Sequence, residues 1–148
     1  MTTLPLRLDH DHLIATTRTG DWLVDTGAPS SFGRTQPILG IGEGPIESDC
    51  MGLDADTLSE LTGVRVEGLL GADLLSRAEL TFDVPGGELI FGTNGASASW
   101  LEVPTRDFMG IPVLDVTDGG VAAAGSPDHG DARLRSVECA CPSPDSPS

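Results

Sequence analysis

The sequence predicts an all-β fold with one or two short helices. Its 148 residues include 19 glycines and 11 prolines, so turns are frequent. Short apolar runs stand between these turn residues, and no long run repeats with the period of a helix. An apolar content of 39% is sufficient for a core, and the length suits one domain, or one domain with a loose tail.

The chain begins with the pattern of three short strands. Apolar and polar residues alternate from Leu4 to Asp9, which is the period of a half-buried strand. The β-branched run from His12 to Arg18 fits as its hairpin partner. After a turn at Thr19–Asp21, the run Trp22–Val24 predicts a third strand that enters the interior. Pro29 cannot extend this strand, because proline lacks the backbone N–H that a sheet requires.

The middle of the chain combines a glycine-rich loop with a helix. Closely spaced glycines between Pro37 and Asp49 predict a pliable hairpin or an Ω-like loop. The sequence leaves open whether the segment Gly40–Pro45 closes over a substrate as a flap. A short helix is expected over Asp54–Gly63, with acidic residues in its first turn and a glycine placed to end it.

Two further strands are expected before residue 92. A strand over Val66–Leu70 ends at a break at Gly71, and a helical turn follows from Ala72 to about Glu79. The alternating runs Leu80–Val84 and Glu88–Phe91 flank a Pro-Gly-Gly sequence, which is a strong hairpin signal.

The composition changes after residue 104, which suggests three regions. We expect one lobe over residues 1–104. Residues 105–125, where Phe108–Val116 still resembles a strand, would be the start of a second lobe or an interface strand. Residues 126–148 are rich in Gly, Ala, Ser, Pro and Asp, and we expect a disordered tail.

Composition also excludes several functions. A net charge of -15, with only 8 lysines and arginines, argues against nucleic-acid binding. Apolar stretches are too short to span a membrane, and no secretory signal follows Met1, so the cytoplasm is the expected compartment. Cys50, Cys139 and Cys141 lack the spacing of a zinc site, so we expect free thiols, no metal and no other cofactor.

Two short motifs carry the candidate chemistry. The run from Leu23 to Ala28 reads Leu-Val-Asp-Thr-Gly-Ala, and a small residue and a Pro-Ser-Ser turn follow its Asp-Thr-Gly core. Asp-Thr-Gly alone is a weak signal. The apolar-apolar-Gly run Leu69-Leu70-Gly71 comes some fifty residues later, followed by a short helix and a hairpin. The pairing of the two motifs at this spacing is moderately specific.

Together these motifs resemble the lobe of the retropepsin and pepsin superfamily of aspartic proteases, in its bacterial retropepsin-like form. The resemblance covers about residues 4 to 92. It implies an acid-protease lobe, a closed or ψ-loop β-barrel, in which Asp25 is the catalytic carboxylate. It also implies that Thr26, Gly27 and Ala28 support the catalytic loop, with the Thr26 hydroxyl tying two such loops together. The strand that ends in Leu69-Leu70-Gly71 would pack behind that loop.

The chemistry of this family needs two carboxylates. Two carboxylates about 3 Å apart share one proton, because like charges that close cannot both ionise. One then deprotonates a water molecule while the other protonates the peptide carbonyl. The sequence holds one Asp-Thr-Gly, and retropepsins supply the second from another subunit of a homodimer. The resemblance therefore implies an aspartic endopeptidase that acts on a polypeptide substrate as a homodimer.

Two alternatives arise because a lone lobe has half of an active site. The chain is alternatively a catalytically silent retropepsin-fold module for dimerisation or binding, or the remnant of a truncated two-lobed protease. Ile111–Thr117 resembles Leu4–Asp9, so a repeat would start there. Asp128, in an Asp-His-Gly sequence, would then be a degenerate second catalytic aspartate.

Simpler interpretations apply to several polar residues. Asp25 is alternatively a turn aspartate that accepts backbone hydrogen bonds, in a β-domain of another kind. Asp73 is expected to cap the short helix after Gly71 and to take no part in catalysis. His10 and His12 are expected to be solvated loop residues and not a metal-binding pair.

Overall fold

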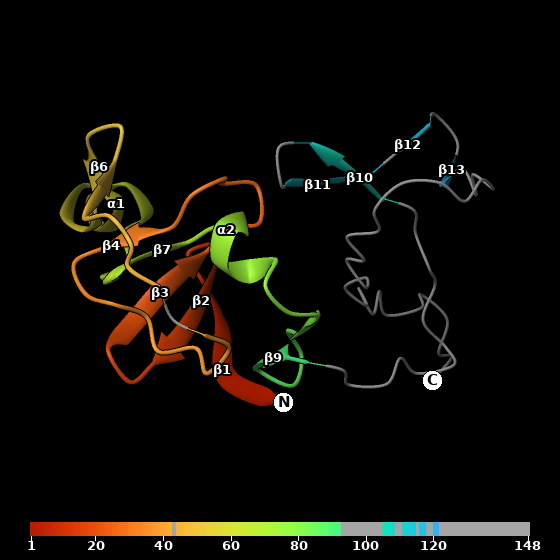
Figure 1. Cartoon of the computed structure of the whole chain (residues 1–148), viewed down its shortest axis with the longest axis horizontal. Helices are drawn as coiled ribbons and strands as arrows, with labels where there is room; N and C mark the ends of the chain where they lie inside the picture. The colour runs from red at the N-terminus through yellow and green to blue at the C-terminus, as the bar shows by residue number, and fades with distance from the viewer. Residues whose placement is uncertain (43, 93–104, 109–110, 115, 118–119, 122–148) are drawn as a thin grey trace, which may run out of the picture.

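The computed structural model describes residues 1–42, 44–92, 105–108, 111–114, 116–117 and 120–121. In these ranges the chain is mostly β-sheet with two short helices, which confirms the predicted all-β class (Figure 1). Seven strands form one sheet in the order β4-β7-β3-β2-β1-β9-β8. They are β1 (Thr2–Asp9), β2 (His12–Thr17), β3 (Gly20–Val24), β4 (Phe32–Gly33), β7 (Gly68–Leu70), β8 (Leu80–Asp83) and β9 (Glu88–Phe91).

The remaining strands form three separate pairs. These are β5 (Asp49–Cys50) with β6 (Leu53–Asp54), β10 (Thr105–Phe108) with β11 (Ile111–Leu114), and β12 (Val116–Thr117) with β13 (Gly120–Val121). Within the described ranges no pairing joins the end strands β4 and β8 of the large sheet, so a closed barrel is not seen there.

The predicted N-terminal hairpin and the predicted hairpin near residue 85 are both confirmed, and β1 joins them. Its residues Leu6–Asp9 pair with β2, and its residues Thr2–Pro5 pair with β9. The turn between β1 and β2 is tight, with His10 and Asp11 at φ of 49° and 64°. Asp tolerates this left-handed region better than most residues do.

Strand β7 lies between β3 and β4, although β3 and β4 are neighbours in sequence. It pairs in parallel with β3, with Leu23 opposite Leu69 and Val24 opposite Leu70. It pairs antiparallel with β4, with Phe32 opposite Leu69. This is the topology of a ψ-loop: the chain leaves β3, forms β4, and returns more than thirty residues later to fill the space between them.

Gly33 on β4 and Gly68 on β7 let these two strands pair directly beside the ring of Trp22, which is fully buried. A Cβ atom on Gly33 would lie 2.5 Å from the Trp22 ring, and one on Gly68 would lie 2.6 Å from it. A Cβ on Gly68 would also lie 2.5 Å from the Gly33 backbone. Any larger residue at either position would separate β4 from β7, because atoms cannot approach so closely.

The central strands are covered on both faces. Leu70 packs in one apolar cluster with Trp22 and with Leu74 of α2 (Ala72–Leu75). Leu69 packs in a second cluster with Leu58 of α1 (Ala55–Thr62). Because neighbouring residues of a strand face opposite ways, the two helices lie on either side of β7 (Figure 1).

The two helices differ in how well the sequence predicts them. Helix α1 begins and ends as expected: Asp54 accepts a hydrogen bond from the Thr57 N–H at 2.8 Å, and Gly63 ends the helix at a φ of 71°. Helix α2 is one turn long and does not reach Glu79 as predicted. It ends early because Leu80 must already lie in β8, opposite Phe91.

Truncation of Leu70 should strongly destabilise the lobe. Leu70 is fully buried in the strand between β3 and β4, so Leu70→Ala should lower the free energy of unfolding by about 2–5 kcal/mol. Leu61→Ala is the control, because Leu61 is 73% exposed on α1 and its loss should change stability by less than about 0.5 kcal/mol. Denaturant melts measure both, and equal losses would contradict this account of the packing.

Candidate active site

The loop that carries Asp25 starts where β3 ends. The Asp25 backbone N–H donates to the Leu70 carbonyl at 3.0 Å, which extends the β3–β7 pairing by one residue. The half-buried Asp25 carboxylate then accepts a hydrogen bond from the Gly27 N–H at 2.8 Å. The Ala28 N–H donates to the Asp25 carbonyl at 3.3 Å. Backbone on both sides of Asp25 is therefore fixed, and its carboxylate is oriented by its own loop.

Gly71 brings the same loop into contact with the start of α2. The Ala72 N–H donates to the Ala28 carbonyl at 2.7 Å. A Cβ atom on Gly71 would lie 2.8 Å from the carbonyl oxygens of Ala28 and Ser30, so only glycine permits this approach. The two sequence motifs, which are about 45 residues apart, thus meet in space.

Hydrogen bonds between the buried Ser31 and Asp73 of α2 hold the C-terminal end of the loop. Ser31, 5% exposed, donates to the Asp73 carboxylate from its hydroxyl at 2.5 Å and from its N–H at 2.8 Å. The Ser31 hydroxyl also accepts a hydrogen bond from the Gly71 N–H at 2.8 Å. One hydroxyl therefore satisfies two groups on the segment that contains the second motif.

The expected capping role of Asp73 is wrong. Gly71 is the N-cap residue of α2, and no side chain caps that helix end. The Asp73 carboxylate turns toward the loop after Asp25 because Ser31 offers it two donors there. Sequence reasoning missed this role, since the two residues are 42 positions apart and an Asp at the start of a helix is also an ordinary capping pattern.

Thr26 and Gly27 complete the loop after Asp25. A Cβ on Gly27 would approach the Asp25 carboxylate to 3.2 Å. Thr26 is half-buried, and its hydroxyl forms no hydrogen bond with another residue in the described ranges. The described part of one chain thus leaves this hydroxyl available to a further group.

The strand that leads to Asp25 is fixed at its other end by an ion pair. Arg7 on β1 donates to the Asp21 carboxylate on β3 at 2.8 Å, and the Thr16 hydroxyl on β2 donates to it at 2.7 Å. The hydrogen bond from Arg7 is the main cause that lowers the pKa of Asp21 below its usual value. Asp21 therefore stays ionised at neutral pH and holds three neighbouring strands in register.

The glycine-rich segment is attached to the body of the lobe. The Arg77 guanidinium donates to the Gly42 carbonyl at 3.0 Å and to the Asp73 carbonyl at 3.1 Å. Gly40 packs on Thr2, where a Cβ would lie 2.9 Å from the threonine hydroxyl. Residue 43 of this segment lies outside the described residues. The described part of Gly40–Pro45 thus contacts β1 and Arg77, which follows α2.

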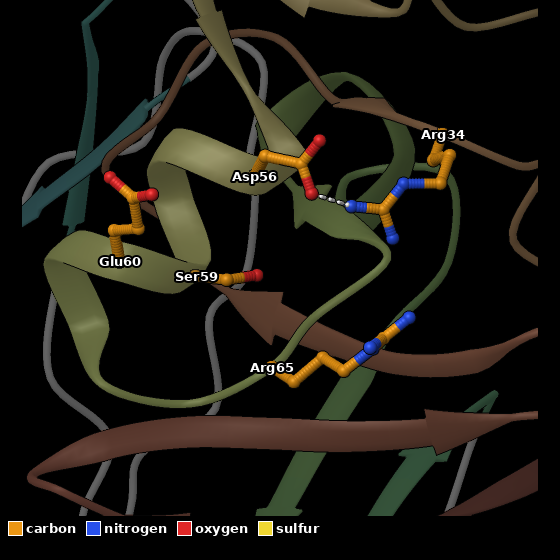
Figure 2. A pocket seen from close by; sticks show the side chains of 5 residues that line it. All are labelled: Arg34, Asp56, Ser59, Glu60 and Arg65. Carbon is orange, nitrogen blue, oxygen red and sulfur yellow. Dashed lines mark hydrogen bonds and ion pairs between the residues drawn. The ribbon is translucent and has the colours of Figure 1, made fainter.

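An open pocket of about 640 Å³ lies near the Gly68 end of β7, away from Asp25. Figure 2 shows Arg34 and Arg65 on one side of it, with Asp56 across from Arg34. Arg34 pairs with Asp56 at 2.5 Å and with Glu67 at 3.4 Å. Because carboxylates already neutralise Arg34, the pocket offers little net charge to a ligand.

Other predicted positions give no further site. In the described ranges, no three His, Cys, Asp or Glu side chains gather as metal ligands. His10 is exposed and contacts the Asp9 carboxylate at 2.7 Å. Asp128, Cys139 and Cys141 lie outside the described residues, whereas Cys50 is a half-buried free thiol.

No helix among the described residues is long and apolar enough to cross a membrane. Comparison with protein-family models, with curated proteins and with solved structures finds no match.

The Ser31 contact gives a testable consequence. Ser31→Ala removes the acceptor of the buried Gly71 N–H and a donor to Asp73, so it should destabilise the lobe by about 1–3 kcal/mol. Ser30→Ala is the matched control, because the neighbouring Ser30 is exposed and should contribute less than about 0.5 kcal/mol. Chemical denaturation of both variants measures the difference. Indistinguishable stabilities would show that the Ser31–Asp73 link does not hold the loop.

Proposed function

We propose that the lobe over residues 1–92 is half of an aspartic endopeptidase, and that a second copy of the chain supplies the other half. The observation that carries this proposal is the position of Asp25. It follows β3 directly, and its N–H bonds to the strand that passes between β3 and β4. The same two motifs that resemble retropepsins are the ones joined by these contacts.

The proposed reaction uses the two Asp25 carboxylates of a homodimer. At about 3 Å they would share one proton. The ionised carboxylate takes a proton from a water molecule, which attacks the peptide carbonyl, and the protonated one donates its proton to the carbonyl oxygen. The Gly27 N–H, which already donates to the Asp25 carboxylate at 2.8 Å, holds that carboxylate in place. No metal or other cofactor takes part in this scheme.

The Thr26 hydroxyl fits the same proposal. It lies next to Asp25, half-buried, without a hydrogen-bond partner among the described residues of its own chain. In a homodimer the two Thr26 residues would meet beneath the dyad and tie the two loops together, which is the role that the resemblance implies for this residue.

A catalytically silent module is the second candidate. Asp25 contacts the Gly27 N–H as an ordinary turn aspartate does, and in the described ranges no ion pair involves it. Asp83 makes a comparable contact, accepting from the Gly86 N–H three residues further on at 2.8 Å, in a plain hairpin turn. A silent module that forms dimers, or the remnant of a two-lobed protease, would have this geometry without turnover.

Asp83 therefore provides a matched control for the catalytic role of Asp25. Asp25→Asn should lower peptide cleavage by roughly 10²–10⁴-fold or more, because the variant can neither accept the proton from water nor share one with its partner. Asp83→Asn changes another carboxylate that accepts a backbone N–H in a turn, and it should leave cleavage unchanged. The measurement is turnover of a peptide library at several protein concentrations, with and without a statine-type inhibitor.

Three outcomes would count against the protease. Turnover that is equal in Asp25→Asn and the parent chain would falsify the catalytic role of Asp25. Turnover that the inhibitor does not reduce would indicate a contaminating activity. A dimer that cleaves nothing at any acidic or neutral pH would favour the silent module.

A further inference from the structure

His12 lies on the same face of the large sheet as Asp25. Ile14 of β2 is opposite Leu23 of β3, and both lie in the apolar cluster on the side of α1. Alternate residues of a strand share one face. His12 stands two residues before Ile14, and Asp25 stands two residues after Leu23. Both side chains are therefore on the side of α1.

Side chains that are opposite each other on β2 and β3 meet on this face. Thr16 of β2 is opposite Asp21 of β3, and its hydroxyl donates to the Asp21 carboxylate at 2.7 Å. The register of these two strands, continued to their other end, places His12 opposite Asp25.

Both residues still belong to extended, paired backbone at that end of the sheet. His12 is opposite Asp9 of β1, and the Asp25 N–H donates to the Leu70 carbonyl of β7. Opposite residues of antiparallel strands hold their Cβ atoms about 5 Å apart. The imidazole of His12 and the carboxylate of Asp25 are therefore close enough for the charge on one to act on the other.

The His12 ring is available for such an interaction. It is half-buried in β2, whereas the sequence predicted a solvated loop residue. In the described ranges His12 forms no hydrogen bond or ion pair. The charged or titratable groups around it are Asp9 on β1, Asp25 after β3, Arg7, His10 and Asp11 in the same hairpin, and Glu60 in the last turn of α1, whose C-cap Gly63 lies against His10.

Asp9 is already paired with other cations. Its carboxylate contacts the His10 ring at 2.7 Å and the Arg7 guanidinium at 3.5 Å. Asp25, by contrast, accepts a hydrogen bond from the Gly27 N–H and has no cation beside it in the described ranges except His12. The two side chains thus form a titratable pair at the candidate active site that the dyad alone does not use.

We propose that His12 is a positioning residue of the Asp25 site, whose positive charge favours the ionised form of the Asp25 carboxylate. Its part in cleavage rests on the proposed function. An aspartate pair gives up its shared proton at about pH 5, and histidine is usually charged below about pH 6.5. Both His12 residues of a homodimer would carry their charge when the dyad loses its proton. They would therefore set the upper pH limit of cleavage below that of the aspartates alone.

The pH profile of cleavage tests this role. His12→Gln removes the charge and keeps a polar side chain, so the pH at which kcat/KM falls to half on the alkaline side should rise by about 0.3–1 pH unit. His12→Arg keeps a positive charge at every pH, so its limit should stay at the parent value or below it. A merely structural role of His12 would lower activity at every pH and leave this limit in place.

His10→Gln is the matched control, because it removes the same charge two residues away. His10 is exposed, contacts Asp9 and lies against Gly63 of α1, so water screens its charge from Asp25. The upper pH limit of His10→Gln should match the parent. An equal rise in His10→Gln and His12→Gln would be an effect of net charge and would overturn the assignment to His12.

Titration of His12 by NMR gives a readout that needs no cleavage. The full chain with Asp25→Asn lacks the negative charge beside His12, so the imidazole signal of His12 should titrate at a pH lower by about 0.2–0.5 unit. Asp83→Asn is the control, because Asp83 is on the edge strand β8, and it should leave the signal unchanged. The signal that is missing in His12→Gln identifies His12.

The outcomes separate this pair from the protease. Equal His12 titrations in Asp25→Asn and Asp83→Asn overturn the pair. An active enzyme whose upper pH limit does not move in His12→Gln overturns the role of His12 and leaves the protease standing. A chain that cleaves nothing but shows the NMR shift keeps the coupling of His12 to Asp25 and removes the protease.

Discussion

The threading of β7 between β3 and β4 is the constraint on which the rest of the lobe depends. Because β7 lies there, the Leu70 carbonyl accepts a hydrogen bond from the Asp25 N–H. The same position lets the loop that follows Asp25 pack directly on Gly71. Leu69 and Leu70 face the two separate apolar clusters, so β7 also joins both layers of the core. The candidate site is thus a direct extension of the most buried part of the fold.

The elements that could be predicted from the sequence are those with a local cause. The alternation of apolar and polar residues predicted β1, and the Pro-Gly-Gly turn predicted the β8–β9 hairpin. The acidic start and the glycine end of α1 gave its bounds to within a residue or two, because capping involves neighbours in the chain. The prediction of the length of α2 was wrong, because Leu80 already pairs in β8 and no local signal in the sequence indicates that pairing.

The site was predictable only in part. Asp25 and Leu69-Leu70-Gly71 stood out as motifs, but the hydrogen bonds of Ser31 with the Gly71 N–H and with the Asp73 carboxylate join residues about forty positions apart. The need for glycine at positions 33 and 68 depends on the ring of Trp22, which only the packed structure brings there. Long-range packing leaves no periodic trace in a sequence, so single-chain patterns indicate the centre of the site and miss its support.

The threading of β7 also has a consequence for synthesis of the chain. Asp25 and Leu70 are 45 residues apart, and non-local parallel pairing forms slowly because a long loop must close first. At roughly 5–20 residues per second, a ribosome needs about 2–9 s to make the residues between them. During that interval the edge of β3 that later pairs with β7 is open, and an open strand edge can pair with another chain. The nascent lobe is therefore most prone to aggregate before Gly71 has been made.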